Sequence, residues 1–202
     1  MKLFYSPGAC SLAPHIVLRD SGTPFTLEKV DLGTHRTASG ADYYAISPSG
    51  QVPLLQLQDG SLLSEGPVIA QYIADQAGKL TLMPAAGTLA RYRVMSWQSY
   101  ITSELHKSFS PLFNAAFDTT AKSLHAKLLL DKFKWIDSQL EGRSYLTGED
   151  FTAADAYLFT VTGWAKYVNL DLSQLSHLQR FLTTVAARPA VREAMTAEGL
   201  LG

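Results

Sequence analysis

The sequence has a single cysteine, almost no net charge and no long apolar run, and each of these scarcities excludes a class of protein. One cysteine in 202 residues excludes an internal disulfide framework. The 17 basic and 18 acidic side chains leave a net charge of −1, which attracts neither nucleic acid nor an anionic membrane. No apolar run approaches the roughly 20 residues that span a bilayer. We therefore expect a globular, cytoplasmic protein with no nucleic-acid or membrane partner.

That one cysteine, Cys10, lies where a reactive thiol would be placed. It follows a β-rich segment, Lys2–Tyr5, and the pair Pro7-Gly8, and it precedes a helical pattern that begins near Ser11. A thiol at a helix N-terminus is close to the positive end of the helix dipole and to unpaired amides, and both favour the thiolate. The alternative is a buried, inert cysteine. The placement favours the reactive thiol and predicts a lowered pKa.

The first 80 residues alternate between strand and helix patterns. The predicted elements are strand Lys2–Tyr5, helix Ser11–Ser21, strand Phe25–Leu32, a short helix Ala38–Ile46, strands Leu54–Gln58 and Ser61–Leu63, and a helix that begins at Ser64 or Glu65. Because a helix joins the first two strands, they should be parallel, whereas the last two form an antiparallel hairpin. The order βαβαββα predicts an α/β domain over residues 1–80.

Strand patterns disappear after a segment of small residues, Gly78–Gly87, which we interpret as containing a linker at 81–87. The remaining chain, 88–202, is predicted to be all-helical. Its expected helices are Thr88–Ala116, bent or interrupted near Pro111, then Ala121–Leu140, Phe151–Val168, Leu172–Ala187 and Pro189–Thr196. The third of these is apolar on nearly every side, so it should lie at the centre of the helical domain.

Two short motifs in the first domain suit an extended, doubly charged ligand. Val52-Pro53 precedes a strand, and Val52 there could offer its backbone to a ligand, although an ordinary turn is the better reading of these residues alone and the peptide bond could be cis or trans. Ser64-Glu65-Gly66 precedes a helix, with Ser64 as a candidate N-cap. Free amides and the Glu65 carboxylate would suit an amino-acid head group; a solvated acidic turn is the alternative.

The helical domain adds one structural motif and one candidate contact. Thr152 and Asp155 have the spacing of a capping box, to which we assign a folding role. His106-Lys107, beside Glu104, either contacts an anionic ligand or forms a solvated helix face. No histidine has cysteine or carboxylate neighbours at ligand spacing, so we expect no metal site.

Five segments together resemble the beta-class glutathione S-transferases of bacteria. They are Lys2–Ser11, Gly50–Pro53, Ser64–Gly66, Glu104–Lys107 and Phe151–Tyr157; they occur in the right order, and the resemblance extends over essentially the whole chain. The surroundings of Cys10 are specific to the class, whereas Val52-Pro53 and the capping box are shared by transferases at large. The resemblance implies a thioredoxin-like N-terminal domain, an all-helical C-terminal domain, a homodimer and glutathione as co-substrate, with no tightly bound cofactor.

The resemblance also implies roles for individual residues. Catalysis would involve Cys10, His106, Tyr5 and Ser11. Glutathione would be bound by Cys10, His35, Val52, Pro53, Glu65, Gly66, Ser99, Ser103, Glu104, His106 and Lys107. Val52 would pair with the cysteinyl part, and Glu65 and Gly66 would hold the γ-glutamyl end. The chain departs from the family pattern at His35, where a lysine is usual, and at Ser99, where an asparagine is common.

The implied activity is conjugation of glutathione to a small hydrophobic electrophile, with thiol–disulfide exchange or peroxidase activity through Cys10. The electrophile pocket would lie between the domains, near Tyr5, Leu112, Phe113, Phe117 and Trp164. Two alternatives remain open at this point. One is a glutathione-binding stress or interaction module with little turnover. The other is a glutathione-dependent isomerase, whose family usually has a serine-rich motif where this chain has Pro7-Gly8-Ala9-Cys10.

Overall fold

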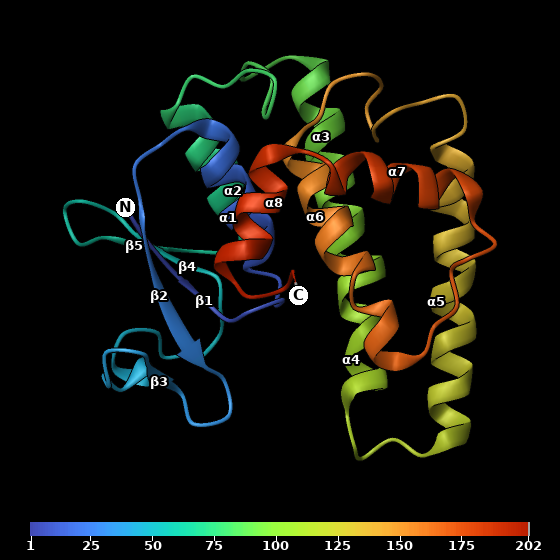
Figure 1. Cartoon of the computed structure of the whole chain (residues 1–202), viewed down its shortest axis with the longest axis horizontal. Coiled ribbons are helices and arrows are strands. Elements are labelled where there is room, and N and C mark those ends of the chain that lie inside the picture. Colours follow the sequence, from blue (N-terminus) through green and yellow to red (C-terminus); the bar gives the residue numbers. More distant parts are fainter. Residues whose placement is uncertain (202) are drawn as a thin grey trace.

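A five-stranded sheet forms the N-terminal part of the computed structural model, which describes residues 1–201 (Figure 1). The strands are β1 (Lys2–Tyr5), β2 (Thr26–Asp31), β3 (Arg36–Thr37), β4 (Leu54–Gln56) and β5 (Leu62–Ser64), in the order β3-β2-β1-β4-β5. β1 and β2 are parallel, and β4 and β5 form an antiparallel hairpin. Both of these pairings confirm the expectation from sequence.

The helix predicted over Ala38–Ile46 is wrong. The chain instead makes the short strand β3, which pairs antiparallel with β2, and a single 3₁₀ turn at Tyr43–Ala45. Gly40, at φ +89°, lets the chain reverse between the two elements. Only Tyr43 in this stretch has a large, fully buried side chain. The stretch therefore lacks the row of apolar side chains that an amphipathic helix would bury.

Two helices complete the N-terminal part, and eight helical segments follow the connecting segment. The first two are α1 (Leu12–Ser21) and α2 (Gly66–Gln76). The others are α3 (Leu89–Tyr100), a π-helix η2 (Ile101–His106), α4 (Lys107–Phe113), α5 (Thr119–Gln139), α6 (Ala153–Thr162), a 3₁₀ helix η3 (Ala165–Val168), α7 (Ser176–Ala186) and α8 (Pro189–Ala197). Figure 1 shows the α3–α4 column and α5 side by side, with α6 between them and α1.

Two helix boundaries differ from the sequence prediction. The long helix is interrupted by the π-helix Ile101–His106, whereas Pro111 lies inside α4. The apolar helix predicted to reach Val168 ends at Thr162, because Gly163 follows and the chain tightens into η3. The π-helix matters for function, since such segments are frequent at functional sites and this one carries Ser103, Glu104 and His106.

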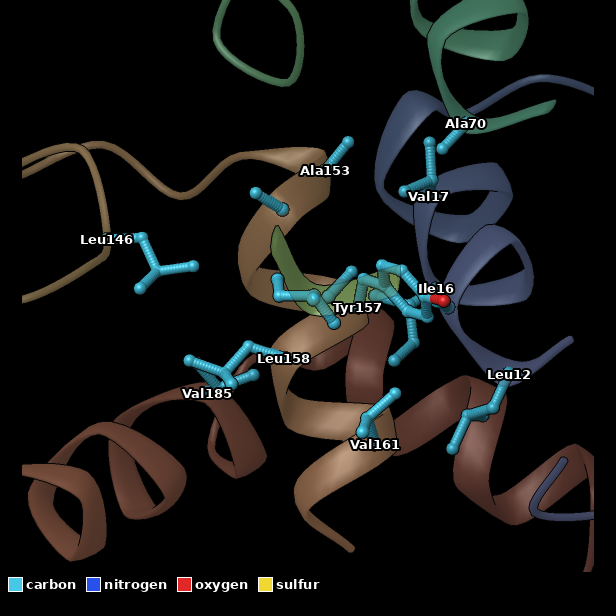
Figure 2. Close-up of a cluster of buried hydrophobic side chains, with 14 of the residues drawn as sticks. Leu12, Ile16, Val17, Ala70, Leu146, Ala153, Tyr157, Leu158, Val161 and Val185 are labelled. Carbon is cyan, nitrogen blue, oxygen red and sulfur yellow. The ribbon is translucent and has the colours of Figure 1, made fainter. Parts of the chain in front are cut away.

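The sheet part and the helical part share one hydrophobic core. Figure 2 shows Leu12, Ile16 and Val17 of α1 packed beside Tyr157 and Val161 of α6. As predicted, α6 is buried on nearly every side.

The segment that connects the two parts joins this core. Leu82 and Met83 are 2% and 1% exposed, and the Leu82 carbonyl accepts a hydrogen bond from the Ala153 amide at 3.0 Å. These contacts show that the segment packs on the core, but they do not mark where a linker begins or ends. The boundaries 81–87 stay a prediction. None of the helices in residues 1–201 is long and apolar enough to cross a bilayer.

The capping box at the start of α6 is confirmed, and the structure gives it a wider role. Asp155 is fully buried and accepts hydrogen bonds at 2.8 Å from the Thr152 amide, the Thr152 hydroxyl and the Leu146 amide. The carboxylate thus ties the preceding loop to the central helix. Burial raises its pKa to about 6, although these hydrogen bonds act in the opposite direction.

We expect Asp155→Ala to lower the free energy of unfolding by roughly 2–4 kcal/mol, because two buried amides each lose their acceptor. Chemical denaturation at pH 7 measures the change. Asp131→Ala is the matched control, since this exposed carboxylate bonds only Lys134 within the described chain, and its loss should cost under about 0.5 kcal/mol. Equal midpoints for Asp155→Ala and the unaltered protein would contradict the role of this carboxylate.

Candidate functional site

A cavity of about 660 Å³ lies where the N-terminal sheet part meets η2, α4 and α6. Eight residues that the sequence predicted as site residues line it: Cys10, His35, Val52, Pro53, Glu65, Gly66, His106 and Lys107. They come from segments far apart in the chain, and they bring a thiol, two imidazoles, a carboxylate and an ammonium group to one space. These eight residues therefore lie around one cavity between the two parts of the molecule.

Two predicted catalytic residues of the first domain do not line this cavity. The Ser11 hydroxyl is fully buried and donates to the Ser6 carbonyl at 3.2 Å, so it closes the loop before α1. The Tyr5 ring is buried beside His15, with 6.2 Å between ring centroids. Burial, and secondly the charge of Glu198, raise the pKa of Tyr5. Both residues support the loop that carries Cys10.

Three predicted binding residues of the long helix also lie outside the cavity lining. The Ser103 hydroxyl donates to the Ser99 carbonyl at 3.2 Å, within the helix itself. Glu104 forms an ion pair with Lys132 of α5 at 2.9 Å. Because these side chains are engaged on other faces of the helix, the cavity of the single chain does not include them.

The cavity also includes residues that sequence reasoning missed. Tyr157 of α6, Thr102 of η2 and Ser110 of α4 line its helical wall. Tyr157 lies two residues after Asp155, in a helix that the apolar pattern marked only as core. No local signal in the sequence separates Tyr157 from its buried neighbours.

The environment of Cys10 differs from the sequence prediction. Its Sγ donates a hydrogen bond to the Val52 carbonyl at 3.2 Å. Burial raises the pKa of the thiol to about 11, and the charge of Glu65 adds to the rise. The amides of Cys10 and Ser11 act in the expected, lowering direction, but desolvation outweighs them. The predicted lowering of the Cys10 pKa is therefore wrong for the free protein.

The loop before Cys10 is fixed from two sides at Gly8. Its amide donates to the Glu198 carboxylate at 2.9 Å, and its carbonyl accepts from the Trp164 indole at 2.8 Å. Glu198 also bonds His15 at 2.8 Å, and both of these side chains are completely buried. Gly8 has φ +71°, and a side chain there would press on Leu200 at 3.4 Å. The C-terminal residues therefore position the loop that places the thiol.

His35 lies on the sheet side of the cavity in an unusual backbone conformation, with φ +50°. Its ring stacks on Tyr44 with 4.3 Å between centroids, and its Nδ1 is buried without a hydrogen-bond partner in residues 1–201. Gly50 faces both rings, and a Cβ there would lie 2.6 Å from Tyr44 and 2.9 Å from His35. Glycine is thus needed to leave room for the imidazole.

The start of α2 presents charge and free amides to the same cavity. Glu65 is the N-cap residue, with φ +67°, so the prediction of Ser64 as N-cap is wrong. Gly66 and Pro67 of the first turn also line the cavity, and the Val52–Pro53 peptide bond opposite is cis. A carboxylate beside a helix N-terminus can hold a ligand ammonium and a ligand carboxylate together.

His106 connects the cavity to the helical core. Its Nδ1 lies 2.6 Å from the Tyr157 hydroxyl, and its ring packs edge-on against Trp164 with 4.7 Å between centroids. Burial, with a smaller contribution from Lys107, lowers the pKa of His106. The imidazole is therefore neutral at neutral pH and can both donate and accept a hydrogen bond.

The five residues expected at the electrophile pocket do not lie together. Tyr5 and Leu112 are buried, whereas Phe113 and Phe117 are 52% and 38% exposed. Trp164 lines a separate, largely apolar cavity of about 360 Å³ that also includes Gly8. Phe113 does lie beside Trp164, at 6.4 Å between centroids, so an apolar wall stands next to His106.

Comparison with known proteins matches two family models to this chain. Residues 8–76 match the model of the glutathione S-transferase N-terminal domain, and residues 100–189 match that of the C-terminal domain. The glutathione S-transferase GstA of Escherichia coli O157:H7 is 46% identical over 200 residues, which cover 99% of this chain and all of that protein.

Solved structures give the same picture. A ternary complex of BphK, a bacterial GST, is 51% identical, covers 99% of this chain and all of its own, and superimposes with a TM-score of 0.96. A sphingomonad glutathione S-transferase complexed with glutathione is 46% identical, with a TM-score of 0.95, over 99% of this chain and all of that one.

In the ligand-free protein, Cys10 should react slowly with an alkylating agent at neutral pH. Because its pKa is about 11, the rate should rise about tenfold per pH unit across the range in which the folded protein is stable. Mass spectrometry of timed samples measures the rate. Urea-unfolded protein is the control, since its thiol should titrate near about 8.5. A rate in the folded protein that levels off near about pH 8 would contradict the effect of burial.

Proposed function

The chain belongs to the glutathione S-transferase family, and from this premise we propose which residues bind glutathione and how they act. The enzyme conjugates glutathione, its co-substrate, to electrophilic substrates. The observation that carries the assignment of the site is that Glu65, Val52 and Cys10 line one cavity. A carboxylate, a backbone edge and a thiol in one cavity match the groups that the tripeptide offers.

Each end of glutathione has a complementary partner in the cavity. The Glu65 carboxylate binds the γ-glutamyl ammonium group, and the first amides of α2, at Gly66, bind the adjacent carboxylate. The Val52 backbone pairs with the cysteinyl part. His35 and Lys107, which lie at the cavity wall, supply the positive charge or donors for the glycyl carboxylate.

Conjugation then uses the sulfur of glutathione as the nucleophile. The thiol loses its proton to solvent, the thiolate forms a bond to the electrophilic carbon, and the leaving group departs with its electron pair. His106 and Cys10 face the place of the sulfur. The apolar wall that Trp164 and Phe113 form beside His106 suits a small hydrophobic electrophile. Conjugation of such compounds would give the enzyme a role in detoxification.

Thiol–disulfide exchange is a second proposed activity, and the position of Cys10 in the cavity favours it. The Cys10 thiolate attacks the glutathione sulfur of a mixed disulfide, and the substrate thiol leaves. A second glutathione thiolate then attacks this adduct, which releases glutathione disulfide and restores Cys10. The raised pKa of Cys10 makes this route slow at neutral pH. Peroxidase activity through the same thiol belongs to the same proposal.

We further propose that the enzyme is a cytoplasmic homodimer. Leu89 and Tyr92 of α3 and Val68 of α2 are 65%, 55% and 47% exposed, which is much apolar surface for one side of a free monomer. A free cysteine and a free thiol co-substrate suit a reducing compartment. The family membership favours a transferase over the two alternatives, a binding module with little turnover and an isomerase.

Glu65→Gln should raise the Kd of glutathione about 10- to 100-fold, because the amide keeps the shape of the side chain but loses the charge that pairs with the ammonium group. Isothermal titration calorimetry measures the affinity. Glu149→Gln, an exposed glutamate bonded to Ser144, is the matched control and should leave the Kd unchanged. A Kd within about twofold of the original would place the ammonium group elsewhere.

Cys10→Ala should abolish disulfide exchange and reduce conjugation by less than about tenfold, because glutathione supplies the sulfur in conjugation and Cys10 supplies it in exchange. Steady-state assays with an activated aryl chloride and with a glutathione mixed disulfide measure the two activities. Cys10→Ser controls for the lost volume. If both activities fell by the same factor, Cys10 would act only by shaping the cavity.

A further inference from the structure

Tyr157 is a buried residue of α6 that also reaches the glutathione cavity. Its side chain is 5% exposed and packs among the apolar residues between α6 and α1 (Figure 2). Only its hydroxyl meets a polar side chain, since it lies 2.6 Å from Nδ1 of His106. The two rings stand at 80° to each other, with 5.9 Å between centroids. One buried phenol is thus directed at one nitrogen of the cavity imidazole.

This contact determines which nitrogen of His106 carries the proton. A buried hydroxyl must donate its hydrogen, and Nδ1 of His106 is the hydrogen-bond partner of the Tyr157 hydroxyl at 2.6 Å, while Thr102 also lies near enough to lower the pKa of that hydroxyl. Thr102 lies on the same wall, but its own hydroxyl donates to the Gln98 carbonyl at 2.8 Å. When Tyr157 donates to Nδ1, a neutral imidazole must carry its proton on Nε2.

The second ring nitrogen of His106 is open to the cavity. Nε2 makes no hydrogen bond to any residue in 1–201, and it is not among the buried polar atoms that lack a partner. Because His106 lines the cavity together with Cys10, this N–H faces the space in which the sulfur of glutathione would lie. An N–H donor there stabilises a thiolate more than it stabilises a thiol.

We propose that Tyr157 is a positioning residue that holds His106 as the Nε2–H tautomer, so that Nε2 donates a hydrogen bond to the glutathione thiolate. The inference rests on the proposed glutathione site, because it requires the sulfur to lie beside His106. His106 transfers no proton in this role. The thiol proton leaves to solvent, and the hydrogen bond lowers the free energy of the anion that remains and then attacks the electrophile.

The charges around His106 agree with a neutral donor. Lys107, next in the chain, disfavours the imidazolium, and burial acts in the same direction. Glu65 and Cys10 are the titratable groups that face Tyr157 across the cavity, and both would oppose ionisation of the phenol. His106 and Tyr157 are therefore both neutral at neutral pH, and the phenol of Tyr157 remains the hydrogen-bond donor.

Tyr157→Phe tests the proposal with a change that keeps the ring in its apolar surroundings. We expect the pKa of bound glutathione to rise by about half to one unit, as measured by ultraviolet thiolate absorbance. The kcat for an activated aryl chloride should fall about three- to tenfold below that pKa and recover at higher pH. The Kd of glutathione should stay within about twofold, because the tripeptide contacts are untouched.

Tyr145→Phe is the matched control, since it removes the hydroxyl of another buried tyrosine, which accepts a hydrogen bond from Arg188 at 3.4 Å and lies outside the cavity lining. It should leave the pKa and the pH profile unchanged. The ring nitrogen shifts of ¹⁵N-histidine-labelled wild-type protein give an independent readout and should show His106 as Nε2–H. Tyr157→Phe should show a mixture of tautomers.

The outcomes separate failure of this proposal from failure of the site itself. If His106→Ala raises the pKa of bound glutathione and Tyr157→Phe does not, His106 acts without the tyrosine and the proposal is wrong. A wild-type spectrum with the proton on Nδ1 would also overturn it, whether or not the variant folds. If neither substitution moves that pKa, the sulfur does not lie beside His106, and the assignment of the site fails together with the role of Tyr157.

Discussion

The buried hydrogen bond between His15 and Glu198 is the contact on which the geometry of the site depends. Arg19 donates to Nε2 of His15, so the proton on Nδ1 is the one donated to Glu198, at 2.8 Å. The second oxygen of Glu198 holds the Gly8 amide, and the Gly8 carbonyl holds the Trp164 indole. A residue near the C-terminus thereby fixes a loop that begins the chain. If Glu198 were absent, the His15 imidazole and the Gly8 amide would lose their acceptor, and Gly8 would keep only its bond to Trp164.

The shared core explains why Cys10 is not the activated thiol that its position suggests. The N-terminus of a helix favours a thiolate by bringing amides near it, but α1 is packed against α2, α6 and α8, so its first turn has little contact with solvent. The free-energy cost of desolvating the thiolate is then larger than the stabilisation that the amides of Cys10 and Ser11 give it, so the pKa of Cys10 rises. The same packing lowers the pKa of His106. Burial therefore favours the neutral forms of Cys10 and His106, so in the proposed conjugation the reacting anion is the glutathione thiolate.

Most of the site residues came from the resemblance to the family, whereas local patterns in the sequence predicted most of the fold, because their signals lie within a few neighbouring positions. The parallel β1–β2 pair, the central α6 and the capping box of Thr152 and Asp155 are of this kind. Features that depend on contacts between residues far apart in the chain could not be predicted from such local patterns. The Glu198–His15 bond joins residues 183 positions apart, and Tyr157 differs from its core neighbours only in what its hydroxyl meets. The π-helix was hidden for the same reason, since no residue in Ile101–His106 breaks a helix.

The arrangement around the cavity also indicates how two sulfur atoms in one space can have different roles. The Cys10 thiol donates a hydrogen bond to the Val52 carbonyl, and burial keeps the group protonated. In the proposed site, His106, held by Tyr157, offers its own neutral N–H to the incoming sulfur. A hydrogen bond from a neutral donor stabilises a thiolate more than a thiol, so the proposed site favours the ionised form of the incoming sulfur without needing a cation in contact with it. A neighbouring cation would stabilise the thiolate more strongly but would also make it a weaker nucleophile, because nucleophilicity falls with the pKa of the thiol.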